Sequence, residues 1–227
     1  MSDDVARIQA LFGGDAFKFA RWGGPICPVV VGLDDKGTQL FEEAIGAVVE
    51  LAGAKLDEID PEMGANMMVY IMGDWAHAAQ APNLPNFIPD LPLLIERLNK
   101  AGANRYRVFA FDDQGAIRAS ITMLRYDEQM QEAPVDYIAL TEAALAMLVY
   151  DEGGVMQDRP VILAKFEDDD EDIARAVVSP WHGRLLAAAY DPTIPAGSKD
   201  PSLALRLAAR IGVSTDPDEY DDESDEE

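Results

Sequence analysis

The chain has 227 residues, with 42 acidic side chains against 18 lysines and arginines, so its formal net charge is −24. Hydrophobic residues make up 48% of the chain and charged residues 26%, a balance typical of a protein that folds around a core. The acidity argues against nucleic acid as a direct ligand, because neutralising phosphates requires a clustered basic surface.

The length and the charge pattern predict a single globular domain over residues 1–213, followed by a disordered acidic tail over residues 214–227. The tail contains nine carboxylates and no lysine or arginine, so it lacks the apolar groups that would offset the entropy of ordering. Without the tail the net charge is still −15. Acidity is therefore a property of the whole protein, and the tail concentrates it.

The beginning of the chain lacks a positive segment followed by an apolar one, and no run of about 18 apolar residues occurs. We therefore expect a soluble, cytoplasmic protein with no membrane partner. The single cysteine, Cys27, cannot form an internal disulfide, which fits a reducing compartment, and we expect a buried free thiol.

Apolar spacing predicts alternating helices and strands in the first half of the chain. Residues 3–12 and 38–52 carry apolar side chains at helical spacing. Residues 26–33 and 65–72 are apolar runs typical of buried strands, with Pro28 expected at the beginning or edge of the first. This order predicts a helix packed on a sheet.

The middle of the chain predicts a cover segment and then a hairpin. Short helices are expected over 75–80 and 92–100, joined by a proline-rich connection. Strands are expected over 105–111 and 116–124, where Gly115 supplies the positive φ that a short hairpin loop needs.

The remaining elements are predicted to be helices. Residues 134–149 are nearly all apolar, so we expect a central helix buried on every side. Six acids over 167–172 suit the N-terminus of a helix over 173–178, and Ser179 is expected to cap the next helix, before a final one over 201–211. The predicted fold class is α/β (α+β), a small twisted mixed sheet with a hairpin, packed by helices.

The residues that bind metals most readily are scarce. His77, His182 and Cys27 are the only imidazoles and thiol, whereas a closed structural zinc site takes four such ligands. The run 167–172 lacks the alternation of a calcium-binding loop. We expect no metal and no cofactor. The sequence also contains no G-x-S-x-G, Walker loop or dinucleotide-binding glycine pattern.

The order of elements resembles the layout of zincin metallopeptidases, in which a central helix carries H-E-x-x-H. The corresponding segment here reads Thr141-Glu142-Ala143-Ala144-Leu145. Glu142 stands at the general-base position, while Thr141 and Leu145 replace both zinc-binding histidines. The resemblance therefore implies a zincin-like layout without the metal site, in a pseudoenzyme or a scaffold.

Other segments are similar to an uncharacterised bacterial family, a domain of unknown function. They are residues 64–69, which include Asn66, and residues 185–197, which contain Tyr190-Asp191-Pro192. The resemblance singles out Asn66, Tyr190 and Asp191 as candidate binding residues. Each also has a structural alternative: Asn66 bonding a turn, Tyr190 packing, and Asp191 forming a helix-exit turn.

Two side chains are candidates for catalysis. Glu142 is a possible general base if burial raises its pKa, and the alternative is a structural partner for an arginine. His182, at the beginning of a helix, is a possible acid or base, and the alternative is packing or solvent exposure. His77 is expected on the surface or in the cover segment.

Three functions are compatible with this sequence. A full-sized core with −24 net charge and no catalytic motif favours a non-catalytic domain that binds a protein with a basic surface. A metal-independent enzyme using Glu142 is one alternative. An acidic nucleic-acid mimic that occupies basic proteins is another, and it predicts carboxylates spaced along one face.

Overall fold

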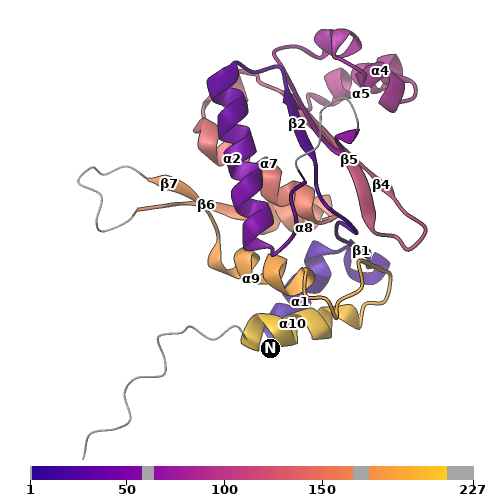
Figure 1. Cartoon of the computed structure of the whole chain (residues 1–227), viewed down its shortest axis with the longest axis vertical. Helices are drawn as coiled ribbons and strands as arrows, with labels where there is room; N and C mark the ends of the chain where they lie inside the picture. Colours follow the sequence, from indigo (N-terminus) through magenta and orange to yellow (C-terminus); the bar gives the residue numbers. More distant parts are fainter. Residues whose placement is uncertain (1, 58–63, 166–173, 214–227) are drawn as a thin grey trace, which may run out of the picture.

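A four-stranded mixed sheet forms the centre of the molecule, seen here in a computed structural model that describes residues 2–57, 64–165 and 174–213 (Figure 1). Its first three strands are parallel and the edge strand is antiparallel. The predicted α/β class, with a small mixed sheet and a hairpin, is confirmed. In spatial order the strands are β2 (Pro28–Val31), β3 (Met67–Met72), β5 (Ile117–Arg125) and β4 (Arg105–Phe111).

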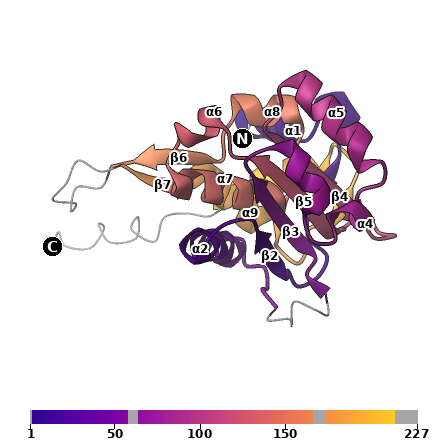
Figure 2. The same ribbon diagram turned by 90° about the horizontal axis from the view of Figure 1, so that it is seen from above.

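Helices α2 (Asp35–Leu51) and α7 (Val135–Met147) cover one face of the sheet (Figure 2). Side chains alternate along β3, so Val69 and Ile71 join the core on this face. Nine residues of α7 are buried. The prediction of a central core helix is confirmed, because an all-round apolar helix has to be enclosed on all sides.

The opposite face is covered by the segment between β3 and β4. It contains the 3-10 helix η2 (Trp75–Gln80) and the helices α4 (Leu84–Phe87) and α5 (Leu91–Ala101). Met68, Tyr70 and Met72 of β3 point into a second apolar cluster with this segment. The predicted cover is therefore correct, and the sheet is buried on both faces.

The lower part of the molecule in Figure 1 is built from the two ends of the described chain. Helix α1 (Ser2–Leu11) packs on α10 (Leu203–Val213), which packs on α9 (Pro180–Ala189). Their apolar side chains join the same core cluster as the α2 face of the sheet. Short elements complete this part: η1 (Gly14–Ala16), β1 (Phe19–Ala20), α8 (Glu152–Gln157) and β8 (Gly197–Ser198). Helix α6 (Glu128–Gln131) lies instead between β5 and α7 in the chain.

The helix expected over 173–178 is wrong. The described part of that segment is a strand, β7 (Arg175–Val178), which pairs antiparallel with β6 (Val161–Ala164). Val177 and Val178 are β-branched and favour the extended form, and β6 supplies the ladder partner. This hairpin projects from the body (Figures 1 and 2). The acidic run 167–172 and the tail 214–227 lie outside the described residues.

Several local predictions are confirmed. Pro28 begins β2 and Gly115 has a φ of 79° in the hairpin loop. The Ser179 hydroxyl caps α9 by accepting a hydrogen bond from the His182 backbone N–H. Cys27 is a buried free thiol.

None of the helices within the described ranges is long and apolar enough to span a membrane.

Gly32 connects β2 to α2 with a φ of 102°, and a Cβ there would lie 1.9 Å from the carbonyl oxygen of Ile71. We expect Gly32→Ala to lower the free energy of unfolding by at least about 2 kcal/mol. The alanine would be strained at a positive φ, and its Cβ would overlap the Ile71 carbonyl oxygen, so the two costs add together.

Urea unfolding checks this, with Gly46→Ala in α2 as the control. A Cβ at Gly46 meets only a Leu56 methyl at 3.9 Å, so the control should gain about 0.5–1 kcal/mol. Equal effects at the two positions would contradict the described geometry.

Candidate functional site

The carboxyl ends of the three parallel strands meet at one edge of the sheet, called here the carboxyl edge. There β2 leads into α2, and β5 leads through α6 into α7. The Tyr126 N–H donates to the Met72 carbonyl oxygen, which ties the β5 exit to the end of β3. Open α/β sheets bind ligands at this edge, because the connecting loops leave a crevice outside the strands.

A pocket of about 180 Å³ lies at the carboxyl edge. It reaches the surface, since Val135 in its lining is 38% exposed. Its volume is below the roughly 300–1,000 Å³ of ligand pockets and close to the roughly 150 Å³ cavity that holds a benzene molecule. It therefore has room for one side chain and not for a cofactor. The lining residues are Leu33, Asp34, Gly37, Phe41, Ile71, Leu124, Tyr126, Met130, Val135 and Ile138.

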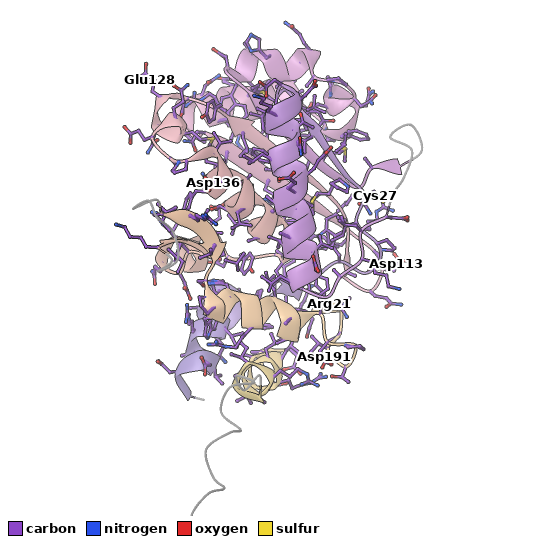
Figure 3. The ribbon with its side chains drawn as sticks, turned by 60° about the vertical axis from the view of Figure 1, so that its left-hand side comes forward. Arg21, Cys27, Asp113, Glu128, Asp136 and Asp191 are labelled. Atoms are coloured by element: carbon purple, nitrogen blue, oxygen red, sulfur yellow. The ribbon has the colours of Figure 1, made fainter. Side chains whose placement is uncertain are left out.

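Five exposed carboxylates come from residues that line this pocket or lie within two positions of them in the chain; we call them the acidic rim. They come from the β2–α2 connection and from the α6–α7 segment. Glu128 and Asp136 lie on the same flank of the molecule in Figure 3, and Asp113 lies on the opposite one. The acidic rim consists of Asp34, Asp35, Glu128, Glu132 and Asp136.

Within the part of the chain that the structure describes, none of these carboxylates is within ion-pair distance of a cation. Lys36 is the one exposed cation among the described residues within two positions of the acidic rim in the chain, and Arg125 pairs with Asp127 at 3.0 Å. The N-termini of α2 and α7 add only about half a positive charge each. The exposed side chains of these segments therefore carry a net negative charge.

Glu142 lies away from this pocket, in the buried middle of α7, with its side chain 1% exposed. Arg107 of β4 donates from one guanidinium nitrogen to Oε2 of Glu142 and from Nε to the Thr122 hydroxyl, 3.0 Å away. The Arg105 Nε lies 3.2 Å from Oε1. Burial lowers the pKa of Arg107, and the Glu142 charge opposes that shift. The geometry fits the structural alternative, a carboxylate paired with arginines.

His182 is fully buried at the beginning of α9. Its Nδ1 lies 2.8 Å from the Ser179 hydroxyl, and its Nε2 lies 4.0 Å from an oxygen of Asp158. Burial lowers the pKa of His182 to about 4, although Asp158 pulls it upward. Arg7 holds Asp158 through two guanidinium nitrogens and stacks over the Trp181 ring, 3.6 Å from its centroid.

The cluster around His182 joins three distant segments: α1, the end of α8 and α9. Ser179 is engaged as the helix cap and Asp158 is held by Arg7. The arrangement resembles a serine, histidine and acid constellation in composition, yet Ser179 and Asp158 already have structural partners, and the buried Nε2 of His182 has no hydrogen-bond partner among the described residues. It fits the packing alternative for His182. His77, by contrast, is exposed on η2, as expected.

The three candidate binding residues stabilise turns and helix ends. Asn66 accepts from the Cys27 N–H at 2.8 Å and donates to the Pro25 carbonyl at 3.0 Å, so it bonds the approach to β2. The Tyr190 hydroxyl donates to the Met147 carbonyl at 2.9 Å, and burial raises its pKa.

Asp191 follows Tyr190 at the exit of α9. Its carboxylate accepts hydrogen bonds from the hydroxyl and the N–H of Thr193, and these lower its pKa. It also lies 3.3 Å from the Arg210 Nε. The structure does not bring these three residues together with Glu142 and His182 into one site.

The acidic rim is the feature that the sequence analysis missed. Asp34 and Asp35 directly follow the strand predicted over 26–33, and polar residues at that place are a signal for the carboxyl end of a sheet. Among the described residues no group of three or more histidine, cysteine, aspartate or glutamate side chains is arranged to hold a metal ion.

Comparisons of the chain with protein-family models, with curated proteins and with solved structures give no match. The resemblance to zincins and the resemblance to an uncharacterised bacterial family therefore remain predictions.

Proposed function

We propose that this chain is a non-catalytic protein-binding domain that recognises a basic polypeptide at the carboxyl edge of its sheet. The observation that carries the proposal is the acidic rim: Asp34 lines the pocket, four further exposed carboxylates lie within two positions of lining residues in the chain, and Lys36 is the exposed cation in the same segments. Complementary charge speeds and orients association with a basic surface.

The exposed side of α2 extends this surface. Glu42, Glu43 and Glu50 are exposed along the helix that begins at the acidic rim. A partner with several lysines or arginines along one segment can therefore meet carboxylates beyond the pocket itself. Such contacts are exposed to solvent, so each is worth only about 0.2–1 kcal/mol, and affinity depends on their number.

The metal-independent enzyme is the less favoured function. A general base needs an unpaired carboxylate near a substrate, whereas both oxygens of Glu142 face guanidinium groups and neither lines the pocket. The acidic mimic of nucleic acid shares the basic partner, and it differs in requiring regular spacing of charge over a longer face.

The test uses the full chain and a nine-residue peptide of alternating lysine and glycine with a central alanine, the alanine peptide. We expect binding that weakens as ionic strength rises, because salt screens exposed charges. Neutralising four members of the acidic rim, by Asp35→Asn, Glu128→Gln, Glu132→Gln and Asp136→Asn, should weaken binding at low salt by about tenfold or more.

The control removes four exposed carboxylates elsewhere, by Asp15→Asn, Asp57→Asn, Glu96→Gln and Asp113→Asn. Both variants have the same net charge, so a general effect of charge weakens binding equally in the two. Equal weakening, or binding that is insensitive to salt, would overturn the proposal. Weakening confined to the variant of the acidic rim would support it.

A further inference from the structure

We infer that the pocket at the carboxyl edge holds one apolar side chain of the basic partner, of leucine or phenylalanine size. The inference rests on the proposed function and adds to it the kind of segment that is recognised: an apolar anchor residue flanked by lysines or arginines. The lysines of the alanine peptide would then pair with the carboxylates of the acidic rim, while its central alanine would leave the pocket empty.

The lining of the pocket selects an apolar group. Phe41, Ile71, Leu124 and Ile138 come from α2, β3, β5 and α7, and each is buried. Four elements of the main core thus fix the walls, so the pocket is formed before a partner arrives. A preformed pocket saves the partner part of the ordering cost of binding.

The acidic residues beside the pocket favour positive charge on the partner residues that flank the anchor. Asp34 belongs both to the lining and to the acidic rim, so apolar and acidic surfaces are continuous there. An apolar anchor seated in a pocket and enclosed by a polar border is the usual arrangement of the strongest contacts in protein interfaces. A neutral or acidic partner would leave the carboxylates of the rim without counter-charges.

The size of the pocket argues for a side chain of a polypeptide. A volume of about 180 Å³ takes one such group, and a single small group contributes too little for useful affinity alone. A polypeptide adds contacts outside the pocket, along the acidic rim and α2. Charge complementarity and pocket size together therefore point to one occupant, a basic segment with a single anchor.

The experiment compares the alanine peptide with a leucine peptide, identical except for leucine at the centre. Burying the leucine side chain should tighten binding by about tenfold or more. Val135→Phe, at the exposed mouth of the pocket, should abolish this advantage, so that the two peptides bind the variant with equal affinity. Leu93→Phe, exposed on α5 at the opposite face of the sheet, is the control and should preserve the advantage.

The outcomes separate the two proposals. If both peptides bind the unmodified chain equally, with salt dependence, the anchor inference fails and the proposed function stands. If neither peptide binds, the proposed function fails as well. If the leucine advantage persists in Val135→Phe, while thermal unfolding shows the variant folded, the anchor lies elsewhere and the inference is overturned.

Discussion

Replacing Glu142 by glutamine is expected to lower the free energy of unfolding by about 3–5 kcal/mol. Removing one partner of a buried ion pair leaves the other charge buried without a counter-charge. Arg107 is that charge, since its side chain is only 18% exposed. Arg105 is half exposed and stays hydrated. Urea unfolding of the full chain measures the loss.

Two variants make this result specific to the ion pair. Glu142→Leu combined with Arg107→Met removes both buried charges and should recover most of the lost stability, because apolar replacements of a buried pair are often neutral. Glu50→Gln, exposed on α2, should change stability by less than about 0.5 kcal/mol. A loss below about 1 kcal/mol for Glu142→Gln would contradict the buried pairing.

Stability is expected to fall as the pH is lowered from about 6.5 to about 4, because of His182. In the unfolded chain the imidazole has a pKa near 6.5, whereas burial lowers the pKa of His182 in the folded protein to about 4. Between these values the unfolded state binds more protons, so stability rises with pH and is lost on acidification. The loss is on the order of 3 kcal/mol.

Proton NMR checks the cause directly. In His77→Asn only one histidine remains, and the imidazole resonances of His182 should keep their neutral positions down to about pH 5. In His182→Gln the same fall in stability should be smaller, even if the starting stability is lower. A titration of His182 midway between pH 6 and pH 7 would contradict its burial.

The core elements could be predicted from the sequence because their apolar spacing is strong. The all-apolar pattern of α7 requires a helix enclosed by other elements, and the run in β3 requires a strand covered on both faces. The strand β7 was missed because the six acids over 167–172 suit the N-terminus of a helix over 173–178. A strand as short as β6 or β7 also gives little periodicity.

The candidate site was harder to predict. Leu33 and Val135 are about one hundred positions apart in the sequence, and only the packing of α2 and α7 on one face brings both to the same pocket. The pairing of Glu142 with arginines could have been predicted from the sequence. Arg105 and Arg107 are two positions apart on one strand, so their side chains share a face. A lone carboxylate within an apolar helix needs such partners.

Methyl NMR of the full chain during titration with the leucine peptide shows whether a basic segment with one apolar anchor binds at the carboxyl edge. The largest shift changes are expected at the methyl groups of Leu33, Ile71 and Ile138, with little change at Leu93 or Leu205. Saturable binding that leaves the pocket methyls unchanged and shifts resonances elsewhere would rule out the pocket as the binding site.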